Sequence, residues 1–232
     1  MHETQKSKWT LSSKRANINT KMQQVKLISF DAEGTLVTPD FSNAIWHEAI
    51  PALYAQKRGI DFATARECIR AEYDKVGDQR VEWYDIEYWF RYLGLGSPEP
   101  VIQVCMHKIR YYPEVTDVIS CLARRYTLIV ASGTPLKLLR CLLKDIEPYF
   151  ARVFSSVSHY REPKSPEFYL RVCEEMAVHP SQVIHVGDNW QFDVLNPQKY
   201  GIRAFYLDRL GKNHQGSLSD LNQFKDLILS LE

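Results

Sequence analysis

The sequence predicts an α/β fold, a doubly wound parallel sheet with an α-helical domain inserted into it. Two patterns lead to this prediction. Short apolar runs alternate with helical patterns from residue 113 onwards, and strands that are apolar on both faces are typical of parallel sheets covered by helices. Residues 41–112, between the first and second runs, contain only helical patterns. That length exceeds an ordinary connection and indicates a second domain inserted into a Rossmann-like core.

Five short runs rich in Val, Ile, Leu and Phe are the predicted strands. They are Val25–Phe30, Thr127–Ala131, Val153–Ser155, Val183–Val186 and Ala204–Leu207. Apolar residues at helical spacing lie between them, over residues 115–122, 136–143 and 168–176. A last helix is predicted over residues 218–231, and Pro197 requires the helix after Asp193 to begin late or to kink.

The inserted block is predicted to hold helices near residues 43–58, 62–77, 82–93 and 99–109. Gly59, Gly77 and the segment 94–98 supply the breaks between them. The predicted division is therefore a core of residues 22–40 and 113–232 with a helical cap of residues 41–112. Residues 1–21 are polar, basic and without period, so we expect a disordered extension there.

Composition excludes several classes of partner. Of the 232 residues, 29 are basic and 28 acidic, so no strong field draws the protein to nucleic acid. No run approaches the ~18 apolar residues of a membrane span, and the N-terminal segment lacks the apolar stretch of a signal peptide. The five cysteines form no CxxC pair and are expected to be small buried residues in a reducing compartment. We expect a cytoplasmic protein without membrane or nucleic-acid partners, and predict no oligomeric state.

Polar side chains follow each predicted strand, at the edge where a parallel α/β sheet binds its ligands. They are Asp31, Glu33, Gly34 and Thr35 after the first strand, Ser132, Gly133 and Thr134 after the second, Lys164 beyond the third, and Asp188 and Asp193 after the fourth. Carboxylates, a hydroxyl and a lysine are thus expected to meet at one place. Stability alone does not account for such a set.

Electrostatics indicates what such a cluster binds. Two carboxylates ~4 Å apart repel by about 4 kcal/mol at an effective dielectric near 20, so cations must lie among them. Lys164 supplies one, and an oxygen-only ligand set selects Mg²⁺ for the other. These cations, with Ser132 and the backbone N–H groups of Gly34 and Thr35, would form a cradle for a phosphoryl group. An aspartate there can attack phosphorus to form an aspartyl-phosphate, so the residues predict phosphoryl transfer.

The same residues resemble a known family. The segment Phe30-Asp31-Ala32-Glu33-Gly34-Thr35-Leu36, then Ser132, then Lys164 before Ser165-Pro166, and finally Gly187-Asp188 with Asp193 resemble the ordered motifs of the haloacid dehalogenase superfamily. The resemblance spans residues 25–207, and the helical insert lies where that superfamily places a cap.

The resemblance implies a role for each position. Asp31 would be the nucleophile and a metal ligand, Ser132 would bind a phosphoryl oxygen, and Lys164 would neutralise the nucleophile and the intermediate. Asp188 and the backbone carbonyl of Glu33 would complete the Mg²⁺ ligands. Asp193 would orient Lys164 or the metal shell, although it could instead cap a helix. Gly34, Thr35 and Gly133 would line the phosphate site. The cap would exclude water and select the leaving group of a small phosphorylated metabolite.

Glu33 departs from the family pattern, in which phosphatases usually carry Asp two residues after the nucleophile as the leaving-group acid. Glu lengthens that arm by ~1.5 Å, and a misplacement of 1 Å can cost ~100-fold in rate. Two alternatives to a phosphatase therefore stay open: a C–halogen hydrolase, which needs no such acid, and a phosphate-binding regulatory protein with weak turnover. Cap aromatic residues, His47 and His185 are expected to be structural.

Overall fold

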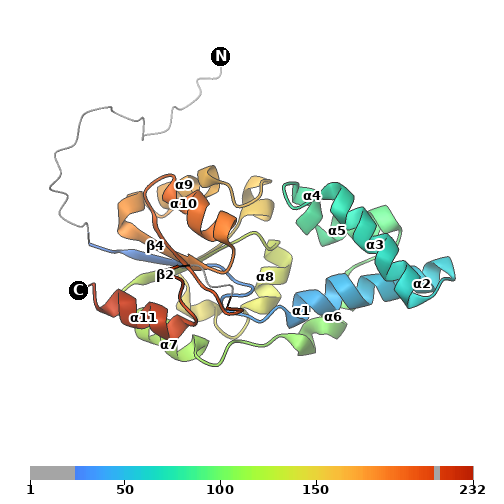
Figure 1. Cartoon of the computed structure of the whole chain (residues 1–232), viewed down its shortest axis with the longest axis horizontal. Coiled ribbons are helices and arrows are strands. Elements are labelled where there is room, and N and C mark those ends of the chain that lie inside the picture. The colour runs from blue at the N-terminus through green and yellow to red at the C-terminus, as the bar shows by residue number, and fades with distance from the viewer. Residues whose placement is uncertain (1–23, 212–214, 232) are drawn as a thin grey trace, which may run out of the picture.

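The computed structural model describes residues 24–211 and 215–231, and within these residues it contains a five-stranded parallel sheet (Figure 1). The strands are β1 (Leu27–Phe30), β2 (Thr127–Ser132), β3 (Arg152–Ser155), β4 (Val183–Gly187) and β5 (Arg203–Tyr206). Their order is β3-β2-β1-β4-β5, so the chain winds outward from β1 in both directions. The doubly wound prediction is confirmed, and the carboxyl end of β1 lies at the switch point where such sheets bind ligands.

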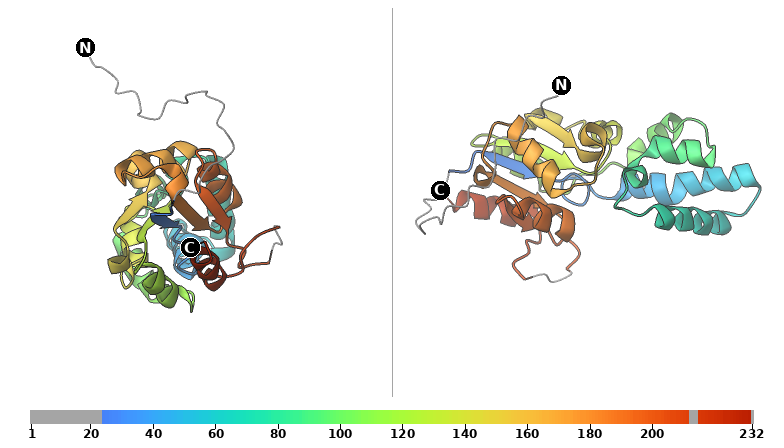
Figure 2. Two further views of the ribbon diagram at one scale, coloured as in Figure 1. Left: turned by 90° about the vertical axis from the view of Figure 1, so that its left-hand side faces the viewer. Right: turned by 90° about the horizontal axis from the view of Figure 1, so that it is seen from above.

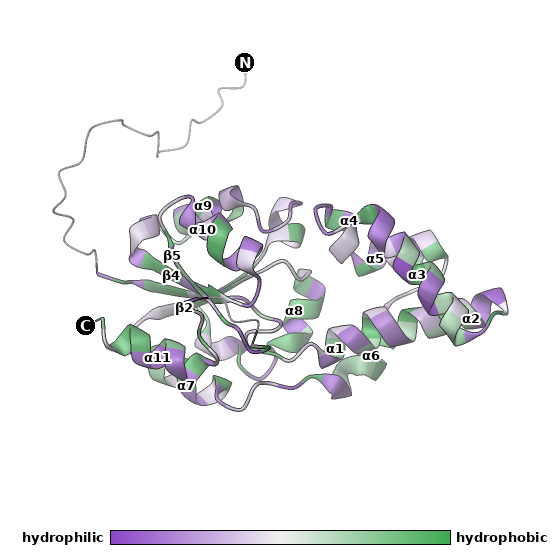
Figure 3. Ribbon diagram, viewed as in Figure 1, coloured by the Kyte–Doolittle hydropathy of each residue, from purple (hydrophilic) through white to green (hydrophobic). Residues whose placement is uncertain are grey.

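Helices cover both faces of the sheet. In chain order they are α7 (Val115–Leu122), α8 (Leu136–Leu142), η3 (Glu147–Tyr149), η4 (Ser156–Tyr160), α9 (Pro166–Glu175), η5 (Pro180–Gln182), η6 (Trp190–Leu195), α10 (Asn196–Gln198) and α11 (Leu221–Leu229). Ile28 and Phe30 pack towards α7, α8 and α11, whereas Leu27 packs towards α9. Alternate strand residues thus enter two separate cores. Figure 3 shows that hydrophobic residues recur along the strands and the helices that cover them.

The predicted helical block is present between β1 and α7, to one side of the sheet (Figure 2). It contains α1 (Asp40–Asn43), η1 (Ala44–Ala49), α2 (Ile50–Arg58), α3 (Phe62–Val76), α4 (Val81–Tyr84), α5 (Ile86–Leu93), α6 (Glu99–Cys105) and η2 (Met106–Lys108). Its centre is the fully buried Trp89, whose ring centroid lies 4.6 Å from that of Tyr73.

The prediction of a single helix over residues 82–93 is wrong, because the structure has two helices there, α4 and α5. The chain leaves helical geometry at Asp85, whose side chain accepts hydrogen bonds from the N–H groups of Glu87 (2.9 Å) and Tyr88 (3.1 Å). Asp85 therefore caps α5 and separates it from α4. Pro197 is the second residue of α10, which follows η6 directly, with helical backbone angles already at Leu195. The helical segment after Asn189 therefore starts before Asp193, and not late as the sequence allowed.

Two linkers join the block to the core at the carboxyl edge of the sheet. Val37 in the first pairs with Tyr111 in the second, and the Thr38 N–H donates to the Arg110 carbonyl at 2.8 Å. The chain therefore enters and leaves the block at neighbouring points, directly beyond Asp31.

Three other predictions concern the whole chain. The proposed extension, residues 1–21, lies outside the described residues. The cysteines are all unpaired, with Cys105 and Cys173 buried as expected, but Cys68 is exposed, contrary to the prediction. None of the described helices combines the length and apolar character needed to span a bilayer.

Candidate active site

The residues predicted from the strand ends meet at the carboxyl edge of the sheet. Asp31 follows β1, Ser132 ends β2, Lys164 precedes α9, Asp188 follows β4 and Asp193 lies in η6. Carboxylate oxygens of the three aspartates lie within 4.8 Å of one another. The five residues thus line one recess, which contains this cluster of carboxylates, as the sequence predicted.

Lys164 is the cation of this cluster. Its side chain is buried, and Nζ donates to Asp31 Oδ1 at 2.8 Å and to Asp193 Oδ1. Burial alone would lower the pKa of Lys164, but Asp193 and then Asp31 raise it well above its usual value. Lys164 therefore stays charged, and its backbone is held by Asn196, whose side-chain amide donates to the Lys164 carbonyl at 2.7 Å.

Asp193 is turned into the site and does not cap the helix that contains it. The cap of η6 is Asn189, whose side-chain oxygen accepts from the Phe192 N–H at 3.0 Å. Asp193 Oδ2 accepts from the Asn189 N–H at 2.9 Å, and Oδ1 is shared by side-chain donors. Those donors are Lys164, His185 at 3.0 Å and Tyr169 at 3.3 Å. Burial would raise the pKa of Asp193, but Lys164 and His185 outweigh it and hold the pKa well below its usual range.

His185 is buried within β4, as a structural residue was expected to be, but it also contacts the site through Asp193. Burial lowers its pKa, so the ring is neutral at pH 7. Since the Asp193 carboxylate can only accept, Nε2 carries the hydrogen and Nδ1 accepts from the Ser29 hydroxyl at 2.8 Å. The sequence signal for this contact was one polar residue in each of two apolar strands, Ser29 in β1 and His185 in β4, which pair in the sheet.

Asp188 lies beside the turn that follows β1. Gly34 has a φ of +74°, and a Cβ there would lie 2.0 Å from Asp188 Oδ2. Only glycine allows both this backbone conformation and this close approach. Although Asp188 borders solvent, the recess removes part of its water and Asp31 and Asp193 repel it, which raises its pKa to about 7.

The donor set fits a divalent, oxygen-preferring ion. Burial and the neighbouring Asp193 also raise the pKa of Asp31, against the attraction of Lys164. The pKa values of Asp31 and Asp188 are thus both raised, by burial and by the negative charges of neighbouring carboxylates. Among the described residues of the cluster, Lys164 is the one positive charge, and it does not balance these carboxylates. Magnesium bound by oxygen ligands would supply that charge.

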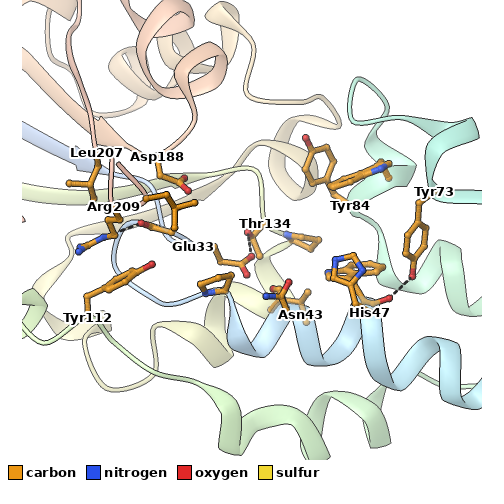
Figure 4. Close-up of a pocket in the computed structure, with 18 of the residues that line it drawn as sticks. Glu33, Asn43, His47, Tyr73, Tyr84, Tyr112, Thr134, Asp188, Leu207 and Arg209 are labelled. Carbon is orange, nitrogen blue, oxygen red and sulfur yellow. Dashed lines mark hydrogen bonds between the residues drawn. The ribbon is translucent and has the colours of Figure 1, made fainter. Parts of the chain in front are cut away.

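Glu33 lines the larger recess together with residues of the helical block. Its Oε2 accepts from the Thr134 hydroxyl at 2.9 Å (Figure 4), and the Thr134 carbonyl accepts in turn from Ser155 at 2.8 Å. Burial raises the pKa of Glu33. Sequence reasoning placed Thr134 after β2 but missed this contact, because the two residues are distant along the chain.

The remaining predicted residues line the floor of the site or support it. Ser132 is buried, and its Oγ accepts from the Thr134 N–H at 3.2 Å. At Gly133 a Cβ would lie 3.7 Å from both the Lys164 chain and the Tyr84 ring, so this glycine separates the lysine from the helical block. Thr35 is fully buried, and among the described residues its Oγ1 has no hydrogen-bond partner.

Two recesses open at this edge. One of about 220 Å³ is lined by Asp31, Ser132, Gly133, Lys164, Asp188 and Asp193 from the core, and by Asp78, Trp83 and Tyr84 from the block. A larger one of about 460 Å³ extends from Glu33 and Asp188 to the aromatic side chains of Trp46, Tyr73, Trp83 and Tyr84. In Figure 4, Tyr84 and His47 lie across this recess from Asp188 and Arg209. Several aromatic residues expected in the core of the block therefore face the site.

Fold and site together define a Rossmann-like α/β protein with a carboxylate and lysine cluster at the switch point and a helical block above it. The family model of haloacid dehalogenase-like hydrolases matches residues 25–195. The chain therefore belongs to the haloacid dehalogenase-like hydrolase family, as the motifs predicted.

Individual relatives include nucleotidases, phosphatases and dehalogenases. The GMP/IMP nucleotidases of Escherichia coli K12 and Shigella flexneri are each 33% identical over 79 residues, 34% of this chain and 35% of theirs, so the match spans about a third of these relatives. A phosphatase of this superfamily from Thermococcus onnurineus superimposes with a TM-score of 0.79 at 23% identity, over 88% of this chain and 98% of that one. The L-2-haloacid dehalogenase of Xanthobacter autotrophicus gives 0.59 at 16% identity, over 90% and 100%. Both structures share the fold.

Proposed function

We propose that the protein is a Mg²⁺-dependent phosphatase that hydrolyses a small phosphomonoester through an aspartyl-phosphate on Asp31. The observation that carries this proposal is the buried Lys164 bound to Asp31 and Asp193, with Asp188 beside them. Residues 22–40 and 113–232 form the catalytic core in this proposal, and residues 41–112 form its cap.

Asp31, Asp188 and the backbone carbonyl of Glu33 would hold the magnesium ion. When bound, the ion would offset the charge of the carboxylates and of the phosphoryl oxygens. Ser132 and the backbone around Gly34 and Gly133 would bind those oxygens, and Lys164 would neutralise the charge that develops on them.

In the first step one Asp31 oxygen attacks phosphorus. An Asp31 O–P bond forms while the bond from phosphorus to the leaving oxygen breaks, and Glu33 gives its proton to that oxygen. In the second step Glu33 takes a proton from water, the water oxygen attacks phosphorus, and the Asp31 carboxylate leaves. Lys164 binds Asp31 Oδ1 in the resting site, which leaves the other oxygen available as the nucleophile. Thr134 directs the Glu33 carboxyl group.

The larger recess supports a leaving group with a flat ring system. Its volume of about 460 Å³ and its aromatic walls suit a nucleoside, and two relatives are nucleotidases for GMP and IMP. Purine nucleoside monophosphates are therefore the first candidate substrates.

The two alternatives make different predictions. A C–halogen hydrolase would need no metal, whereas Asp188 beside Asp31 favours a bound cation and a phosphate. A regulatory phosphate-binding protein would bind Mg²⁺ and phosphate, and would gain turnover when Glu33→Asp restores the usual acid.

The test is a screen of phosphomonoesters that includes GMP and IMP. Each compound is assayed once with Mg²⁺ added at about 5 mM and once with EDTA in its place. Asp31→Asn serves as the inactive reference, and Asp226→Asn, a change in an exposed aspartate of α11, serves as the matched control. We expect phosphate release that EDTA and Asp31→Asn abolish and Asp226→Asn leaves unchanged. Turnover that survives both the chelator and Asp31→Asn would overturn the proposal.

A further inference from the structure

Arg209 follows β5 and reaches the turn beyond β1. Its Nε donates to the Gly34 carbonyl at 3.2 Å and its Nη2 to the Thr35 carbonyl at 2.8 Å. The same Nη2 pairs with Glu114 Oε1 at 2.7 Å, and the guanidinium carbon lies 3.5 Å from the centre of the Tyr112 ring. Figure 4 shows Arg209 and Tyr112 together at the core end of the large recess. One side chain thus joins two distant segments of the chain, the turn at residues 34–35 and the stretch 112–114.

These contacts require arginine. The Arg209 and Glu114 side chains are each only 11% exposed, so the pair is largely removed from water. The planar guanidinium can donate to two carbonyls and a carboxylate while its flat face lies on an aromatic ring. A lysine ammonium has no such face and cannot combine these hydrogen bonds with stacking on the ring. Glu114 is held independently, because its Oε1 also accepts from the Leu221 N–H at 3.3 Å at the start of α11.

The turn that Arg209 holds is confined from two directions. Asp188 packs against the Gly34 Cα, and Arg209 binds the Gly34 carbonyl. The Gly34 N–H donates to the Val37 carbonyl at 2.8 Å. The Gly34 N–H lies in the same peptide plane as the Glu33 carbonyl, and the Gly34 carbonyl that Arg209 binds lies in the next plane. Arg209 therefore restrains the Glu33 carbonyl through the Gly34 Cα, where the two planes meet.

Arg209 also acts where the helical block is attached. Thr35 stands at the start of the first linker, and Tyr112 ends the second, where its N–H donates to the Leu36 carbonyl at 3.2 Å. Because Arg209 contacts Thr35 in the first linker and Tyr112 in the second, it joins both points where the block is attached to the turn at residues 33–35.

We propose that Arg209 is a positioning residue that fixes the turn at residues 33–35 against Asp188 and the bases of both linkers. It thereby sets the Glu33 carbonyl and carboxyl groups for metal binding and proton transfer. The kinetic consequence rests on the proposed function; the structural consequence does not.

The experiment compares Arg209→Ala and Arg209→Lys with wild type. The matched control is Arg171→Ala, since Arg171 on α9 also pairs with a glutamate (Glu162, 2.9 Å) and lies 5.4 Å from a tyrosine ring (Tyr160), but away from the turn. Amide hydrogen exchange is measured in metal-free protein over residues 33–38 and 109–113, with β4 as the internal reference. Mg²⁺ binding by calorimetry and phosphatase kinetics follow.

We expect exchange over residues 33–38 and 109–113 to be at least ~10-fold faster in Arg209→Ala, and intermediate in Arg209→Lys, with β4 unchanged. The Kd for Mg²⁺ should rise at least ~5-fold and kcat should fall ~10-fold with little change in KM. Arg171→Ala should match wild type.

Unchanged exchange and Mg²⁺ affinity in a folded Arg209→Ala protein would overturn the inference. Equal loss of protection in β4 and in the turn, in both Arg209 variants, would also overturn it, because Arg209 would then support only the fold. If wild type proves inactive towards every phosphomonoester while exchange and Mg²⁺ affinity change as expected, the proposed function fails and the positioning role stands.

Discussion

Among the residues that the structure describes, Lys164 and Lys137 each pair with two carboxylates, and they lie in contrasting regions. Lys164, in the core site, contacts Asp31 and Asp193, and all three side chains are at most 10% exposed. Lys137, on α8 at the boundary with the helical block, contacts Glu87 and Glu99, and these side chains are 40–54% exposed. The same set of charged groups is therefore buried in the proposed catalytic site and exposed at the boundary with the helical block, and burial decides how strongly such charges interact.

The sharpest test of this contrast replaces each lysine by methionine. Lys164→Met should lower kcat by at least ~1,000-fold, because the charge on Asp31 and on the phosphoryl group loses its partner. It should also destabilise the fold by about 3–5 kcal/mol, since two buried carboxylates stay behind. Phosphate release and urea unfolding measure the two effects.

Lys137→Met is the matched control and should change stability by less than about 1 kcal/mol, as exposed pairs contribute little. An equal loss of activity in the two variants would refute the contrast between the regions.

A change at Glu33 tests whether this residue of the core protonates the leaving group. Glu33→Gln should lower kcat by ~100-fold for alkyl phosphates and by less for a nitrophenyl phosphate, whose leaving oxygen needs no proton. Steady-state kinetics on both substrates gives the ratio. A loss of equal size for both would assign Glu33 a structural role through Thr134.

A change at Trp83, which lines the large recess from the helical block, tests the proposed contact of the block with the substrate. Trp83→Ala should raise KM for a purine nucleotide by about 10-fold, the loss of one aromatic contact, and leave KM for glycerol phosphate within about 2-fold. Trp190→Ala is the control, because Trp190 has a similar exposure, 39% against 37%, but lines neither recess. Equal effects on both substrates would remove Trp83 from selectivity.

The smallest effect concerns stability without metal. Asp188 has a pKa raised to about 7, so its ionised form costs folding free energy above that pH, and the cost disappears as pH falls towards the unfolded value near 4. Asp188→Asn should therefore stabilise the EDTA-treated protein by about 1 kcal/mol at pH 8, after screening by solvent, and by about a third of that at pH 5. Thermal unfolding at both pH values measures this. A gain that is larger at pH 5 would contradict the sign.

The sheet and the position of the site could be predicted from the sequence because both depend on local patterns. Apolar runs identify the strands, and parallel strands bring Asp31, Ser132, Asp188 and the residues near them to one edge whatever the details of packing. The resemblance to the family motifs then assigned a role to each of these residues.

The rest depends on contacts between distant segments. Whether Asp193 or Asn189 caps η6 is decided by Lys164 and His185, which lie elsewhere in the chain. The contact of Thr134 with Glu33 and the aromatic residues that face the recess require the tertiary arrangement of the block. Arg209 follows β5 without any motif, and its importance appears only from the carbonyls it reaches.

The pairing of Val37 with Tyr111 gives the insertion the ends of a hairpin. A tight turn of a few residues between these positions would close the chain without shifting any strand of the sheet. Helices of another length or composition could equally be grafted there, and the reacting groups would keep their positions. In the proposed enzyme, the insertion that would select the substrate could thus be exchanged while the reacting groups remain on the core.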